Sequence, residues 1–358
     1  MGGMASSQKR VNVIKGPNVS AYVYPRSDSR GAGEALVAAL ARLDLELQGC
    51  ERGHPAARLT VVAAEVDSIL QEINSFEDVS PAVASKDDYA KTMHQLFVSM
   101  DLYRRPMLAI ENEDFIANVN RKEMRRLELQ YLRDRLDELQ KERRSLNAQI
   151  SRTRTLYTQL QQLIESIWPD AGARPGGAQQ ARLARATALR SALAAVSARL
   201  RAAAAYARAH ADCMRDALPA WSAAVHGKSG WERTLACSQA VTLLVRARCA
   251  ERGSRRVLGA PAAPRAAREL RLALDYAFTD AVHDHRFQRA VEVFTQFKDA
   301  VTQLSNTIHQ VLLSNLENLA VAEKDEAKCR RELRAARINA IVKQGLGDYI
   351  YEPKPLRK

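Results

Sequence analysis

Residues 129–167 read LQYLRDRLDELQKERRSLNAQISRTRTLYTQLQQLIESI, and their pattern decides the fold. Apolar residues recur at alternating steps of three and four, the heptad spacing of a coiled coil, and only Arg143 and Thr153 break the series. The seam consists of Leu129, Leu132, Leu136, Leu139, Leu146, Ile150, Tyr157, Leu160, Ile164 and Ile167. Because no Pro or Gly occurs between Asn112 and Trp168, we expect one helix of roughly 85 Å at a rise of ~1.5 Å per residue.

Further helical segments follow this one, separated by short breaks. A long helix is expected over about 179–218, ended by Pro219, and its seam is rich in Leu and Ala. A shorter helix is expected at 231–251, followed by a basic, Gly- and Pro-containing loop at 252–266. The last long helix is expected from about 266 to 343, with a bend near His283. Strand signals are weak throughout the chain.

These patterns predict an all-α fold, an elongated coiled-coil-rich helical bundle with short N-terminal helices folded against one end and with extended tails. The expected organisation is a flexible N-terminal arm at 1–30, a short-helix region at 31–106, a long-helix coiled-coil bundle at 107–344 with breaks near 169–178, 219–230 and 252–266, and an extended C-terminal tail at 345–358. Self-association through the 129–167 seam is the competing arrangement. The direction of helix pairing stays open.

The chain is basic, with 54 Lys and Arg residues against 41 Asp and Glu residues and a net charge of +13. The candidate surface for an acidic partner is a basic run on one helix: Arg182, Arg185, Arg190, Arg199, Arg201 and Arg208. A second basic run lies between Arg246 and Arg271. An acidic protein surface or an anionic membrane would suit these runs. Sequence-specific nucleic-acid binding is not expected, because the runs contain no interleaved aromatic residue other than Tyr206. The competing interpretation is a solvated helix face neutralised by neighbouring helices.

The N-terminus carries a lipidation motif. Gly2 followed by Ser6 fits the N-myristoylation pattern, although Met4 is an alternative start that would erase it. No apolar stretch is long enough to predict a membrane-spanning helix, and no secretory signal peptide is visible. The five cysteines are scattered and never form a CxxC pair, which favours a reducing, cytoplasmic setting.

No motif predicts catalysis. Residues 226–230, HGKSG, resemble the end of a phosphate-binding loop, but Ser222 replaces the first glycine and no strand precedes it. Two His-containing groups, His210 with Cys213 and His283 with His285, lack the further ligands of a metal site. We therefore expect neither an enzyme nor a cofactor or metal.

The sequence leaves two functional hypotheses. The first is a non-enzymatic structural or scaffolding coiled-coil protein in the cytoplasm, associated with the cytoskeleton or a cilium and contacting protein partners through helical packing. The alternative is a peripheral membrane-binding helical bundle that uses its basic faces and an N-myristoyl group on Gly2.

Overall fold

The computed structural model describes residues 29–76, 86–170, 172, 174–261 and 264–343. Every regular element within these residues is a helix, which confirms the all-α prediction. The helices are α1 (Ser29–Glu51), α2 (Pro55–Asn74), α3 (Lys86–Ser99), α4 (Pro106–Glu111), α5 (Glu113–Ile167), α6 (Gly177–His226), α7 (Gly230–Leu258), α8 (Pro264–Asp275), α9 (Ala277–Asp280) and α10 (Asp284–Ile341). The predicted N-terminal arm, with Gly2, lies outside the described residues apart from its last two, Ser29 and Arg30, and the C-terminal tail lies outside them entirely.

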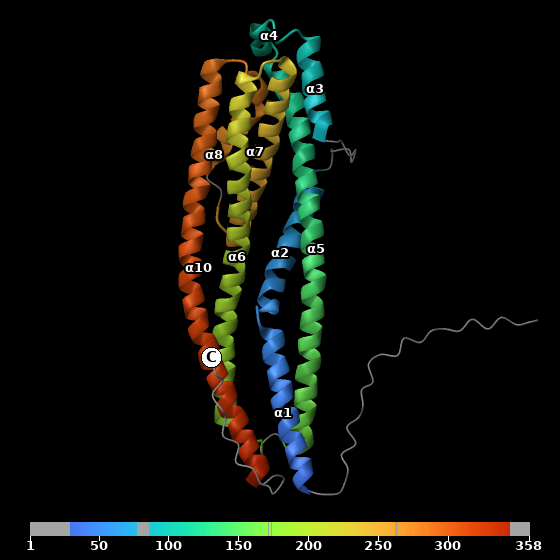
Figure 1. The fold of residues 1–358 in the computed structure, drawn as a ribbon, viewed down its shortest axis with the longest axis vertical. Helices are drawn as coiled ribbons and strands as arrows, with labels where there is room; N and C mark the ends of the chain where they lie inside the picture. Colours follow the sequence, from blue (N-terminus) through green and yellow to red (C-terminus); the bar gives the residue numbers. More distant parts are fainter. Residues whose placement is uncertain (1–28, 77–85, 171, 173, 262–263, 344–358) are drawn as a thin grey trace, which may run out of the picture.

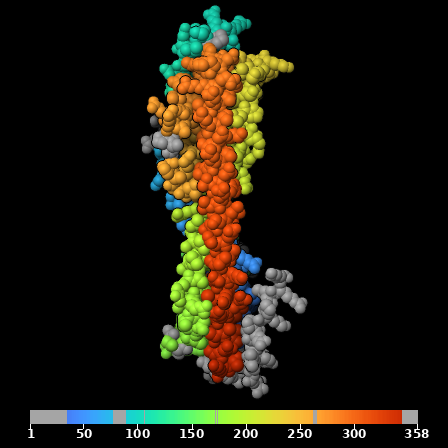
Figure 2. Space-filling view, turned by 90° about the vertical axis from the view of Figure 1, so that its left-hand side faces the viewer, coloured from blue at the N-terminus to red at the C-terminus, as the bar shows by residue number. Residues whose placement is uncertain are grey.

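The bundle is elongated because three long helices follow its whole length, with α6 antiparallel to both α5 and α10 (Figure 1). The 58 residues of α10 span roughly 87 Å at ~1.5 Å per residue. Helix α6 packs against both α7 and α10, whereas α1 and α2 pack against α5. We call α1, α2 and α5 the first layer, and α6, α7 and α10 the second layer. Figure 2 shows α10 following one face from end to end, with α8 beside it in the upper half.

The sequence suggested that the short N-terminal helices gather at one end of the bundle, but the structure shows that they do not. Helices α1, α2 and α3 follow one another along α5 from one end of the molecule to the other (Figure 1). The α5 seam therefore has partners within its own chain. Leu132, Leu139 and Leu146 pack against Val62, Val66 and Ile69 of α2, and Ile164 packs against Leu40 of α1.

The α5 seam departs from the predicted pattern at one position opposite α1. Leu156 is buried against Leu43 and Leu47 of α1, whereas the predicted seam residue Tyr157 is 44% exposed. The turn between α1 and α2 includes Gly53 and His54, both at positive φ. The predicted register is otherwise kept along α1, where Leu160, Ile164 and Ile167 all pack.

Helix α6 continues through Pro219 to His226, so the break predicted at 219–230 is confined to 227–229. A proline inside a helix removes one backbone hydrogen bond and normally bends or ends the helix. Here Trp221 follows two residues later and is buried, with its ring stacked on Phe287 at 5.4 Å and edge-on to Phe294 at 5.3 Å. This aromatic packing on α10 stabilises the last turns of α6.

Helix α7 also extends further than predicted, through Gly253 to Leu258. The glycine is a packing site rather than a helix breaker, because a Cβ atom on it would lie 2.6 Å from the ring of Tyr206 on α6. The Tyr206 hydroxyl donates a hydrogen bond to Glu65 of α2 at 2.9 Å. Gly253 thus permits the close approach of α6 and α7 that brings Tyr206 to the first layer.

We expect Gly253→Ala to lower the free energy of unfolding by about 1–3 kcal/mol, because the methyl group overpacks against a buried ring. The matched control is Gly49→Ala in α1, where nothing lies within 4 Å of the added Cβ atom. This control should raise stability by about 0.5–1 kcal/mol, the usual gain for Ala over Gly in a helix. Urea unfolding followed by circular dichroism measures both. Equal effects of the two substitutions would contradict the packing described for Gly253.

The last predicted helix is divided, because the chain reverses direction between α8 and α10 (Figure 1). The buried Asn120 side chain of α5 donates hydrogen bonds to the carbonyl oxygens of Leu274 at 2.8 Å and Asp275 at 3.0 Å. It also accepts one from the Tyr89 hydroxyl at 2.6 Å. Asn120 therefore satisfies the terminal carbonyls of α8, which would otherwise be buried without partners.

Candidate functional site

A charged network joins the two layers in the lower half of the bundle. Arg190 of α6 donates to Glu326 of α10 at 2.6 Å and to Glu51 of α1 at 3.2 Å. Arg330 of α10 donates to the same two carboxylates. The four side chains are only 5–14% exposed. We call these four residues the lower network. Two arginines and two carboxylates balance in charge, as burial of charged groups requires.

The network changes the acidity of Glu51. Burial alone would raise the pKa of this carboxyl, but the hydrogen bond from Tyr157 and the charges of Arg330 and Arg190 outweigh burial and lower the pKa below 4.5. Glu51 is therefore held in its ionised form. The exposed Tyr157 contributes to the network through its hydroxyl, although its ring lies outside the apolar seam.

A second charged cluster joins the layers higher in the bundle. Arg248 and Arg252 of α7 both contact Glu128 of α5, and Arg252 and Arg256 both contact Glu72 of α2. These arginines belong to the second basic run of the sequence. Because α7 is helical to Leu258, that run faces carboxylates of the first layer instead of forming a loop. Part of the arginine excess therefore serves contacts within the chain.

The six arginines of the candidate partner surface divide into two groups. Arg190 belongs to the lower network, and Arg182 forms an ion pair with Glu332 at 3.0 Å. The other four are exposed and have no acidic partner among the described residues: Arg185, Arg199, Arg201 and Arg208. The structure therefore does not bring the six together as one surface.

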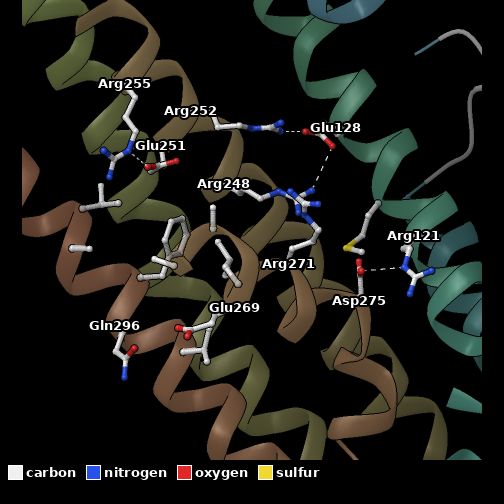
Figure 3. Close-up of a pocket in the computed structure, with 18 of the residues that line it drawn as sticks. Arg121, Glu128, Arg248, Glu251, Arg252, Arg255, Glu269, Arg271, Asp275 and Gln296 are labelled. Carbon is white, nitrogen blue, oxygen red and sulfur yellow. Dashed lines mark hydrogen bonds and ion pairs between the residues drawn. The ribbon is translucent and has the colours of Figure 1, made fainter. Parts of the chain in front are cut away.

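A cavity with a volume of about 550 Å³ lies between α5, α7, α8 and α10. Six arginines and four carboxylates line it. Figure 3 shows Arg248 and Arg252 directed toward Glu128, and Arg121 paired with Asp275. Val293, Phe297 and Val301 of α10 and Leu270 of α8 line the side opposite α5, together with the polar Gln296 and Glu269 (Figure 3). The arginines thus gather toward α5 and α7, and the α10 side is mostly apolar.

The positive charge in this cavity is incompletely neutralised. The Nε atoms of Arg248 and Arg252 are buried and have no hydrogen-bond acceptor among the described residues. Burial lowers the pKa of both guanidinium groups, and the nearby charge of Arg271 lowers it further, although neighbouring carboxylates oppose this. We call this cavity the arginine cavity. The second basic run of the sequence includes Arg248, Arg252 and Arg271, and Glu251 and Glu269 interrupt it. The sequence did not reveal that Glu128 of α5 and the apolar residues of α10 would face this run.

The remaining motifs of the sequence, His210 and residues 226–230, lie in a helix-packing contact and in a turn. His210 is buried, its Nδ1 lies 3.1 Å from the carbonyl oxygen of Ala247, and its ring meets Phe297 edge-on. Residues 226–230 form the turn between α6 and α7, where the Ser229 side chain accepts a hydrogen bond from the Glu232 amide. Within the described residues, no group of three or more His, Cys, Asp or Glu side chains is placed to hold a metal ion. No helix in that part of the chain is both long and apolar enough to span a membrane.

A scan against protein-family models and searches of curated proteins and of solved structures found no significant match.

Proposed function

We propose that the protein is a non-enzymatic structural scaffold that holds its partners at a fixed separation on the cytoskeleton. The observation that supports this most strongly is that three helices of 50–58 residues follow the whole bundle, with α6 antiparallel to α5 and α10. Buried ionic clusters, including the lower network, cross-link the layers along this length. Such an arrangement suits a rigid spacer, because long helices with cross-links resist bending and sliding.

The scaffold proposal is tested by expressing the protein with a C-terminal fluorescent tag and extracting the cells with a mild detergent. We expect the signal to remain on insoluble filaments, and we expect Gly2→Ala to leave this retention unchanged. Release of the wild-type protein together with the lipids would contradict the proposal.

The exposed arginines of α6 favour a second candidate, a peripheral membrane-binding bundle. Arg201 and Arg208 lie on one stripe of α6, and both are exposed. Juxtaposed basic side chains attract anionic lipid surfaces. In this case the double variant Arg201→Glu/Arg208→Glu should lose flotation with phosphatidylserine vesicles, whereas Arg268→Glu on α8 should retain it. Flotation that is unaffected by either change would exclude this use of α6.

A further inference from the structure

We propose that the arginine cavity binds a single-chain amphiphilic anion, with its anionic head beside Arg248, Arg252 and Arg271 and its acyl chain against α10. This goes beyond the scaffold function and does not depend on it. The relevant chemistry is a carboxylate or phosphate joined to an aliphatic chain. Three features of the cavity support it, namely the charge balance, the buried donors and the mostly apolar α10 side.

The charge balance of the cavity leaves room for an anion. Arg121 is paired with Asp275, and Arg255 is paired with Glu251. Arg248 and Arg252 share the carboxylate of Glu128 within the cavity, and Arg252 also contacts Glu72, which lies outside it and is shared with Arg256. Arg125 and Arg271 also line the cavity, are exposed, and have no acidic partner among the described residues. The carboxylate of Glu269 contacts Arg265, which does not line the cavity.

The buried donors indicate where the head group would lie. Arg248 donates from Nη2 to Glu128 at 3.4 Å, which leaves its buried Nε–H group without an acceptor in the described structure. The Nε–H group of Arg252 is also buried and has no acceptor in the described structure. Because these Nε atoms have almost no accessible surface, a carboxylate or phosphate oxygen in the cavity would form charge-assisted bonds with the Nη–H groups of the same arginines. Figure 3 shows Arg271 directed toward this same region from α8.

The α10 side of the cavity is mostly apolar, with Gln296 as its polar member, and suits an acyl chain. Val293, Phe297 and Val301 follow one another on α10 at helical spacing, and Leu270 of α8 adds to the same side. A volume of about 550 Å³ is within the range of pockets that hold small organic ligands. An inorganic anion would contact the arginines but would leave these apolar residues hydrated, so the cavity favours an amphiphile over an ion alone.

The test is isothermal titration calorimetry of the full chain with oleate and with lysophosphatidate, each below its micelle concentration. Inorganic phosphate represents the head alone, and a monoacylglycerol represents the chain alone. We expect at least one of the two lipid anions to bind, and to bind at least about tenfold more tightly than either half-ligand. Comparison of the two lipids identifies whether the carboxylate or the phosphate head is preferred.

Two variants locate the site, and one variant controls for charge. Arg271→Gln should weaken binding of the preferred lipid by about tenfold or more, through loss of a charged hydrogen bond. Ala300→Trp should also weaken it, because the indole would occupy the cavity beside Val301. Arg268→Gln removes an exposed arginine from the same helix outside the cavity and should leave binding unchanged. Circular dichroism melting checks that each variant is folded.

Two results would overturn the proposal. One is the absence of binding by both lipid anions to the folded wild-type protein. The other is equal affinity of the wild type, Arg271→Gln and Arg268→Gln, which would place any binding elsewhere. Inorganic phosphate that binds as tightly as the lipid anions would also count against an amphiphile.

Discussion

Replacing Glu326 by Ala is expected to lower the free energy of unfolding by about 3–5 kcal/mol, because it leaves a buried positive charge without a partner. Glu326 is only 5% exposed on its side chain and contacts both Arg190 and Arg330. In its absence, these two arginines share the single carboxylate of Glu51. The loss is a large part of the stability of a typical protein, about 5–15 kcal/mol.

The matched control for this prediction is Glu317→Ala on the same helix. Glu317 is exposed and forms no ion pair with the described residues, so its removal should change stability by less than about 0.5 kcal/mol. Guanidinium-induced unfolding monitored by circular dichroism compares the two variants with the wild type. If Glu326→Ala unfolds at the same midpoint as Glu317→Ala, the lower network does not stabilise the bundle.

The same network predicts how stability depends on pH. The folded-state pKa of Glu51 lies below its unfolded value of 4.5. The contribution of Glu51 is therefore fully present above about pH 4.5, and it is lost as the pH falls through the lower folded-state value. Unfolding measured between pH 7 and pH 3 should show this loss, and Glu51→Gln should reduce its size.

Replacing Trp221 by Ala is expected to cost about 3–5 kcal/mol, the usual range for deleting a fully buried aromatic side chain. Trp221 is 1% exposed and packs against Phe287 and Phe294 where α6 meets α10. Its indole Nε1 atom has no hydrogen-bond acceptor among the described residues. Trp221→Phe should therefore cost much less than Trp221→Ala, because no hydrogen bond is lost.

Trp231→Ala is the control for the tryptophan prediction. Trp231 is 38% exposed and forms a T-shaped contact with His94 at 5.1 Å, so its removal should cost less than about 1.5 kcal/mol. Urea unfolding of Trp221→Ala, Trp221→Phe and Trp231→Ala tests whether Trp221→Ala loses the most stability. A smaller loss for Trp221→Ala than for Trp231→Ala would mean that the packing around Pro219 is not as described.

The helical pattern of residues 129–167 was sufficient to predict α5, because its spacing is local and uninterrupted by Pro or Gly. Pro219 and Gly253 were wrongly interpreted as helix ends. Each lies inside a helix, because aromatic packing between that helix and a neighbouring one outweighs the local preference of the residue. Trp221 packs against α10, and Gly253 accommodates Tyr206 of α6. Intrinsic propensity is a weak guide where such tertiary contacts decide.

The end of α8 was missed for a similar reason. Residues 275–283 contain neither Pro nor Gly, and the residue that satisfies the α8 carbonyls, Asn120, lies on α5. The arginine runs were visible in the sequence, but their partners were not. Glu72 and Glu128 come from α2 and α5, and only the fold brings them to Arg252. Long-range charge pairing leaves no local pattern that a single sequence reveals.

We expect the buried networks to hold the two layers as one rigid bundle. Pulsed electron paramagnetic resonance measures this between spin labels on Leu45→Cys of α1 and Val321→Cys of α10, two exposed positions. The partly exposed Cys50 and Cys213 are replaced by Ser. We expect one narrow distance distribution that is unchanged at about 1 M NaCl, because buried ion pairs are screened much less than exposed ones. A broad or two-peaked distribution that changes with salt would contradict the account.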